Sequence, residues 1–108
     1  MLSQVQSLVR LHELEFGIDE NVHLQPERTQ TEIERCRAEL PSGLLARYEQ
    51  LKTRYSVGAV VEVEDGVCGG CRLSLPKSLA DRLKRRLVFC DHCGRILYHP
   101  DLVYNLQH

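Results

Sequence analysis

Cys68-Gly69-Gly70-Cys71 and Cys90-Asp91-His92-Cys93 are the two stretches that decide the fold of this chain. Each is a C-x2-C pair, and 18 residues lie between the two pairs. This spacing is typical of zinc sites. Structural Zn²⁺ takes four ligands in a tetrahedron, so four thiolates would complete its coordination shell and leave no open position. The pattern therefore predicts one structural zinc ion bound by Cys68, Cys71, Cys90 and Cys93.

Other chemistries of paired cysteines fit this sequence less well, although the pattern alone leaves them open. A thioredoxin-like redox motif needs one C-x2-C pair beside a βαβ unit rather than two pairs in a small β unit. An iron–sulfur cluster also uses four thiolates, but the clustered ligand runs of ferredoxins are absent. His92 and His99 lie close enough in sequence to replace a cysteine, although four cysteines already satisfy the metal.

Glycines accompany both cysteine pairs and indicate tight turns. Gly69 and Gly70 allow the backbone to fold back so that both sulfurs of the first pair point at one metal. Gly94 follows the last cysteine, where we expect a backbone conformation that bulkier residues avoid. Backbone N–H groups in such turns can donate to the thiolates and offset their negative charge.

The compartment is expected to be the cytoplasm. Residues 1–6 lack the basic and apolar regions of a signal peptide, and no apolar run approaches the ~18 residues of a membrane span. Paired cysteines in a reducing cytosol are more often metal ligands than disulfides. Cys36, the fifth cysteine, is expected to be a small residue in a helix core.

The N-terminal part of the chain has the periodicity of an amphipathic helix. Over residues 2–23, apolar side chains recur at steps of three and four; they are Leu8, Leu11, Leu14, Ile18 and Val22. Gly17 weakens this prediction locally. His12 and His23 are expected on the surface or within the helical hairpin, with no catalytic role.

Two further helices are predicted over residues 27–40 and 42–55. One apolar stripe crosses both of them, and its members are Ile33, Cys36, Leu40, Leu44, Tyr48, Leu51 and Tyr55. Pro41 removes a backbone donor and clashes with the preceding turn, so a bend or break is expected there. With the first helix, these segments predict an antiparallel, coiled-coil-like helical hairpin over residues 1–55.

The second half of the chain is richer in β-branched residues and turns. A strand is predicted over 57–63, a turn over 64–66, a helix over 76–86, and short strands over 87–89 and 96–98. Residues 56–108 are therefore expected to form a small zinc-ribbon domain. The predicted fold class is α+β, with the helical hairpin followed by the four-cysteine ribbon.

Charge is distributed unevenly between the two halves. Residues 1–66 carry seven Lys/Arg and twelve Asp/Glu, a net charge of −5, whereas residues 67–108 carry seven and three, a net charge of +4. A basic segment can contact nucleic-acid phosphates. The candidate residues are Arg72, Lys77, Arg82, Lys84, Arg85, Arg86 and Arg95. Tyr98 and Tyr104 could stack on bases, although strand tyrosines more often lie in a core.

Several longer stretches resemble a known family. They are residues 44–51, 58–61, 64–71, 75–76 and 90–98, the last reading C-D-H-C-G-R-I-L-Y. Together they resemble the bacterial C4-type zinc-ribbon proteins, most closely over residues 40–99. The resemblance implies an N-terminal coiled-coil hairpin, shortened here, and zinc on the four cysteines. It also implies a role as an adaptor for transcription or secretion machinery or as a nucleic-acid-binding protein, without a common enzymatic activity.

Two classes of function follow from these observations. The first is a non-enzymatic adaptor whose helical hairpin binds a protein partner, a second copy of the chain being the simplest version. The alternative is a regulatory protein that binds RNA or DNA through its basic half. By analogy with regulators that insert a hairpin tip into RNA polymerase, Asp19, Glu20 and Glu27 would lie near such a tip. An enzyme is not expected, because a closed four-thiolate zinc offers no Lewis acid.

Overall fold

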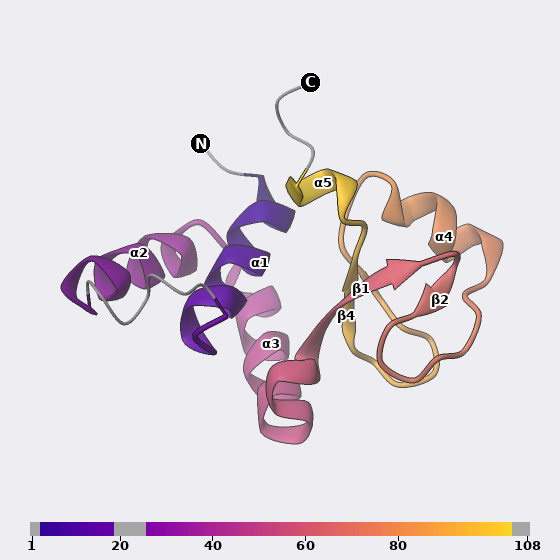
Figure 1. Ribbon diagram of the computed structural model, residues 1–108, viewed down its shortest axis with the longest axis horizontal. Helices are drawn as coiled ribbons and strands as arrows, with labels where there is room; N and C mark the ends of the chain where they lie inside the picture. Colours follow the sequence, from indigo (N-terminus) through magenta and orange to yellow (C-terminus); the bar gives the residue numbers. More distant parts are fainter. Residues whose placement is uncertain (1–2, 19–25, 105–108) are drawn as a thin grey trace.

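A computed structural model describes residues 3–18 and 26–104 of the chain. Three N-terminal helices lie beside a small four-stranded sheet, and two short helices border that sheet (Figure 1). The N-terminal helices are α1 (Gln4–Glu15), α2 (Pro26–Ala38) and α3 (Ser42–Tyr55). The second half holds the 3-10 turn η2 (Ser56–Ala59), β1 (Val60–Glu64), β2 (Val67–Cys68), α4 (Lys77–Leu83), β3 (Val88–Phe89), β4 (Ile96–Tyr98) and α5 (Asp101–Tyr104). The predicted α+β class is confirmed.

Helix α1 begins at a capping box and ends earlier than the sequence predicts. Ser3 and Gln6 bond to each other's backbone N–H groups, which satisfies two of the donors left free at a helix start. Gly17 has a φ of 65°, a left-handed conformation that terminates helices. The predicted helix over 2–23 is therefore wrong over residues 16–18, and Ile18 is 51% exposed rather than on a buried face. Residues 19–23 of that prediction lie outside the described residues.

Helices α2 and α3 confirm the predicted apolar stripe and its interruption. Cys36, Leu40, Tyr48 and Leu51 are buried, and Cys36 fills the core position expected of it. The chain leaves the helical conformation between Ala38 and Ser42, around Pro41, as the missing donor of a proline requires. Helix α3 spans the predicted residues 42–55, whereas α2 ends at Ala38 rather than at residue 40.

A carboxylate on α1 ties the three helices together. Glu15 accepts hydrogen bonds from the Tyr48 hydroxyl at 2.7 Å and the Lys52 ammonium at 2.8 Å, both on α3. Arg37 of α2 donates to Glu15 at 3.3 Å and to Glu49 at 3.0 Å. Because these charges are partly buried and shared among three helices, the cluster fixes how α1, α2 and α3 pack.

The sheet has the strand order β2-β1-β4-β3. Strands β1 and β2 are antiparallel and are joined by Asp65 and Gly66, whose φ values of 54° and 71° suit a tight two-residue hairpin turn. Strand β1 pairs in parallel with β4, which pairs antiparallel with β3. The predicted strand over 57–63 begins later, at Val60, because residues 56–59 form the 3-10 turn.

The elements that border the sheet also differ from the prediction. Helix α4 ends at Leu83, so residues 84–86 of the predicted 76–86 helix form a turn. Helix α5 is an element that the sequence analysis did not predict. Its Tyr104 hydroxyl donates to Glu13 of α1 at 2.9 Å, so the described C-terminal part of the chain returns to the first helix.

Two clusters of buried side chains form the hydrophobic interior. The larger one joins all three long helices to the sheet, since Ala59, Val60, Ile96 and Tyr98 pack with the helical side chains. The smaller one lies inside the ribbon and includes Val63, Leu83, Val88 and Leu97 with two of the cysteines. The larger cluster thus crosses the sequence boundary at residues 55 and 56, and the helices support the sheet that carries the cysteines. None of the described helices is both long enough and apolar enough to span a bilayer.

His12 lies within the helical part, one of the two places expected for it, and not at the surface. Its side chain is buried on α1, and its Nε2 lies 2.7 Å from the carbonyl oxygen of Val57, to which it donates a hydrogen bond in the neutral form. Burial lowers the pKa of His12 below its usual value, and it outweighs the Val57 hydrogen bond and the nearby Glu13 and Glu15, which raise the pKa. The spacing did not predict this burial, because His12 lies about 100° from Leu11 and about 160° from Leu14 around the helix and so falls outside the apolar stripe.

The free energy of unfolding should therefore depend on the protonation of His12. A histidine whose folded-state pKa is lowered binds a proton more readily when unfolded, so stability present above about pH 6.5 is lost as the pH falls below it. We expect the unfolding free energy of the zinc-loaded protein, measured by urea titration, to fall between pH 7.5 and 5.5. The decline should be smaller in His12→Gln, and equal declines in both proteins would contradict this assignment. Proton uptake by the cysteine thiols is common to both and cancels in the comparison.

Candidate metal centre

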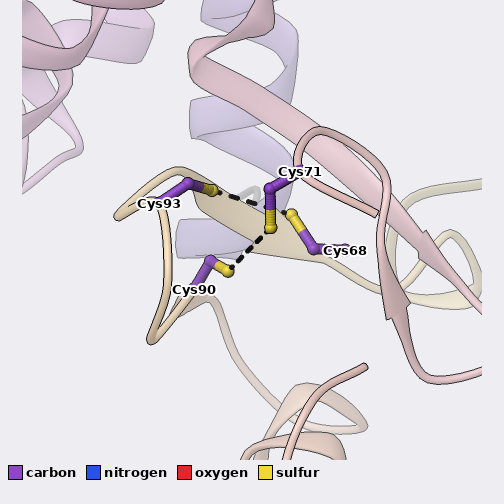
Figure 2. A group of neighbouring side chains, drawn as sticks. All are labelled: Cys68, Cys71, Cys90 and Cys93. Atoms are coloured by element: carbon purple, nitrogen blue, oxygen red, sulfur yellow. Dashed lines mark hydrogen bonds between the residues drawn. The ribbon is translucent and has the colours of Figure 1, made fainter. Parts of the chain in front are cut away.

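The four cysteine sulfurs converge on one point between two turns (Figure 2). All four Sγ atoms lie within 4.8 Å of one another. The Sγ atoms of Cys68 and Cys93 are 3.8 Å apart, and those of Cys71 and Cys90 are 3.7 Å apart. A tetrahedral zinc with sulfur ligands at about 2.3 Å places its sulfurs about 3.8 Å apart. The thiol cluster therefore fits a tetrahedral zinc.

The sheet positions these sulfurs in two pairs. Cys68 is the last residue of β2, and Cys71 lies in the turn that follows. Cys90 comes directly after β3, and Cys93 lies in the turn before β4. Because β1 and β4 are neighbouring central strands, the two hairpin-like units that carry the pairs are held side by side. Sheet pairing thus brings together cysteines that are 19 and 25 positions apart.

Backbone donors approach the sulfurs as expected for a structural zinc site. The N–H of Gly70 donates to Cys68 Sγ at 3.4 Å, and the N–H of His92 donates to Cys90 Sγ at 3.5 Å. In both turns, the donor is the backbone N–H of the residue two positions after the first cysteine of the pair. Each donor offsets part of the negative charge that four thiolates would place around the metal.

The glycines of the first turn are required by space. A Cβ at Gly69 would overlap the backbone carbonyl oxygen of Glu62 on β1, and a Cβ at Gly70 would overlap the Arg95 side chain. In the second turn, Gly94 has a φ of 80°, as predicted from its place after the last cysteine. Arg72 takes the equivalent place in the first turn with a φ of 67°, a conformation that costs a non-glycine residue about 1 kcal/mol.

Arg95 connects the metal centre to helix α3. Its guanidinium lies 4.0 Å from the centre of the Tyr55 ring, and its Nε donates to the carbonyl oxygen of Gly58 at 2.9 Å. The Tyr55 hydroxyl in turn donates to the carbonyl oxygen of Cys93 at 2.7 Å. Arg95 is one of the candidate nucleic-acid residues, and in the structure these contacts place its side chain beside the metal centre. The spacing of residues in the sequence does not predict that Arg95 contacts Tyr55.

The environment of the thiols differs between the two ends of the second turn. Burial raises the pKa of the Cys90 thiol to about 12, although backbone N–H groups of Cys93 and His92 oppose this. Burial also raises the pKa of Cys93, but hydrogen bonds from the backbone and side chain of Arg95 outweigh it and bring the pKa to about 7. Of these two thiols, Cys93 is therefore the one more readily ionised at neutral pH, and thiolates are the form that binds zinc.

The histidines near the cysteine pairs lie outside the sulfur cluster. Among the described residues, the four cysteines are the single group of three or more side chains whose ligand atoms lie close enough for one metal ion. His92 is exposed, with its Nε2 3.7 Å from a carboxylate oxygen of Asp91. His99 accepts a hydrogen bond at Nδ1 from the backbone N–H of Asp101. All five cysteines are free, so the residues of the site form no disulfide in this structure.

The remaining candidate nucleic-acid residues lie at the surface. Exposed side chains on α4, on the turn after it and beside the first cysteine pair are Arg72, Lys77, Arg82, Lys84, Arg85 and Arg86. Tyr98 is buried at 6% exposure and donates to Glu62, so it is a core residue rather than a stacking platform. Tyr104 is 54% exposed, with its hydroxyl engaged by Glu13.

A small sheet that closes two cysteine turns around one tetrahedral four-sulfur site defines the zinc-ribbon class of domains. Residues 67–97 match the family model described as the C4-type zinc ribbon domain. The chain therefore contains a C4-type zinc ribbon, as its cysteine spacing predicts.

Two solved structures are similar over much more of the chain than the ribbon. The HP0958 protein from Helicobacter pylori is 21% identical with a TM-score of 0.60, over 74% of this chain and 35% of that one. CT398 from Chlamydia trachomatis is 30% identical with a TM-score of 0.53, over 80% of this chain and 39% of that one. The chain thus spans well under half the length of either protein. No curated protein matched the sequence.

Proposed function

We propose that this chain is a non-enzymatic adaptor of the cytoplasm, in which one structural zinc holds the C-terminal ribbon and the helices bind a protein partner. The observation that carries the proposal is the closed sulfur site: four thiolates at tetrahedral spacing fill the coordination shell of zinc. A filled shell has no position for water or substrate. The metal would therefore fix a shape that another molecule recognises.

The helical part offers the surface for such recognition. Three large apolar side chains, Phe16, Ile18 and Val57, are 36%, 51% and 50% exposed around the end of α1 and the start of η2. Residues 1–66, which include α1, α2 and α3, carry a net charge of −5. Exposed apolar side chains bordered by charge are typical of protein-interaction surfaces. A transcription or secretion component is the kind of partner that the family resemblance suggests.

In-cell cross-linking with mass spectrometry tests this function, with light scattering on the purified zinc-loaded protein as its companion. We expect reproducible cross-links from residues of the helical part to one partner protein or to a second copy of the chain. The cross-links should disappear in Phe16→Ser/Val57→Ser and persist in Gln30→Ser/Thr31→Ser, which alters the exposed face of α2 instead. A strictly monomeric protein without partner cross-links would contradict the adaptor role.

Nucleic-acid binding is the second candidate, favoured by the exposed basic side chains on and after α4. Lys77, Arg82, Lys84 and Arg85 lie on this face, where Asp81 supplies one opposing charge. Phosphate contacts make affinity fall steeply with salt, with a logarithmic slope of about 0.7 per contacted phosphate for single strands. Fluorescence anisotropy with single-stranded RNA at two salt concentrations tests this candidate. Binding that is absent, or unchanged in Arg82→Ala/Arg85→Ala, would eliminate it.

A further inference from the structure

A groove lies between the helical part and the ribbon, next to the strand that leads into the second cysteine pair. Its volume is about 550 Å³. Helices α1 and α3 contribute one wall, and the segment from the end of the α4 turn through β3 contributes the other. The lining residues are Gln4, Gly43, Leu44, Arg47, Arg86, Leu87 and Phe89.

Two arginines give this groove a positive charge that no acidic residue in its lining balances. Arg47 and Arg86 are both exposed, one from α3 and one from the turn before β3. Within residues 3–18 and 26–104, neither guanidinium forms an ion pair with a carboxylate of this chain. Two guanidiniums flanking one hollow suit a carboxylate or phosphate of a ligand.

Apart from Gln4 and the two arginines, the lining of the groove is apolar. Leu44 and Leu87 pack against the main core and show only part of their side chains to the groove. Phe89 is 40% exposed, although it lies directly before the metal ligand Cys90. Gly43 adds open space, because a Cβ built there meets no atom within 4 Å. A ligand that fills this groove must therefore carry a sizeable apolar group beside its negative charge.

We propose that this groove binds a segment of a partner protein in which an Asp or Glu side chain neighbours a large aliphatic or aromatic one. The proposal rests on the adaptor function and names the chemistry of its partner. Charge complementarity assigns the carboxylate to Arg47 and Arg86, and the apolar side chain fills the space over Leu44 and Leu87. The groove is thus a second candidate contact surface, since none of Phe16, Ile18 and Val57 lines it.

The stacking of Arg47 favours a peptide over a nucleic acid at this place. The Arg47 guanidinium lies over the Phe89 ring, 5.3 Å from its centre. One face of the ring that a nucleobase would use for stacking is therefore covered by this chain's own side chain. Leu44 and Leu87 suit the apolar side chain of a leucine or phenylalanine.

Fluorescence anisotropy on the full zinc-loaded chain tests the proposal. The probe is a labelled peptide that alternates glutamate with leucine and phenylalanine, and the comparison probes replace glutamate by lysine or the apolar residues by serine. We expect binding of the first peptide alone. Arg47→Ala/Arg86→Ala should weaken it by about tenfold, since each charged contact is lost from a largely solvent-exposed site. Arg82→Ala/Arg85→Ala removes equal charge outside the groove and should change the affinity less than about twofold.

A second pair of variants tests the shape of the groove. Gly43→Leu places a side chain in the open space and should weaken peptide binding, whereas Ala46→Leu adds the same group on α3 outside the groove lining and should not. Equal affinity in the groove variants and their controls would overturn the proposal, and so would RNA binding at the groove without peptide binding. If the in-cell cross-links to a partner persist in Arg47→Ala/Arg86→Ala, the groove is wrong while the adaptor function stands. If wild-type protein gives no partner cross-links, the adaptor function itself fails.

Discussion

Removal of zinc is expected to abolish the folded ribbon. The ribbon's own buried cluster is small and includes Cys68 and Cys90 among its members. Without the metal, little apolar burial remains to offset the chain entropy of the segment from 60 to 98. Structural zinc sites contribute about 10–16 kcal/mol of binding free energy that is coupled to folding. We therefore expect that, after chelation, the amide signals of the ribbon in an NMR spectrum lose their dispersion and collapse into the narrow range typical of an unfolded chain.

Substitution of one cysteine ligand should weaken zinc binding without abolishing it. Cys90→Ser removes one of four thiolates, and an equal share of the binding free energy corresponds to about 3 kcal/mol, or more than about a hundredfold in zinc affinity. Competition with a chromophoric chelator measures that affinity. Cys36→Ala is the matched control, because Cys36 is also fully buried but belongs to the helical core. Zinc affinity that is unchanged in Cys90→Ser, or equally weakened in Cys36→Ala, would contradict the assigned ligands.

Gly69→Ala is expected to destabilise the ribbon strongly, although it adds a single methyl group. The new Cβ would overlap the carbonyl oxygen of Glu62, which belongs to the backbone of β1 and cannot rotate away. Either the first cysteine turn or the central strand must shift, and such overpacking costs about 1–3 kcal/mol. We expect the midpoint of urea unfolding of the zinc-loaded protein to fall accordingly, with weaker zinc binding.

Gly43→Ala adds the same methyl group but is not expected to destabilise the protein. Gly43 lies in the first turn of α3, and a Cβ there meets no atom within 4 Å. Alanine is favoured over glycine in helices by up to about 1 kcal/mol, so this variant should be as stable as the wild type or more stable. A Gly69→Ala protein as stable as Gly43→Ala would show that the turn does not pack against β1 as described.

The two cysteine pairs could be predicted from sequence as a candidate zinc site because the spacing within each pair is a local feature. Two residues separate the cysteines in each pair, and the turn glycines lie within or directly after the pairs. The apolar stripe from Ile33 to Tyr55 was readable for the same reason, since one helical face repeats every three or four residues. These features need no knowledge of how distant segments meet.

The features that could not be predicted depend on distant contacts. The parallel pairing of β1 with β4 brings Val60 beside Ile96, and no local pattern announces such a register. No local pattern predicts the contacts of Arg95 with Tyr55 and Gly58 either, and its positive charge alone suggested contact with nucleic acid. The early end of α1 is a different case. Gly17 indicated a helix end in the sequence, but the apolar spacing that includes Ile18 predicted that the helix continues.

X-ray absorption at the zinc edge of the purified full chain, together with its metal content, tests the central claim most directly. A structural four-thiolate site predicts one zinc per chain and four sulfur neighbours at about 2.3 Å, with no nitrogen or oxygen ligand. The spectrum should be unchanged in His92→Ala. A shell of fewer sulfurs completed by nitrogen or oxygen at about 2.0–2.1 Å would contradict the account, because the metal would then have a histidine ligand or an open, reactive position.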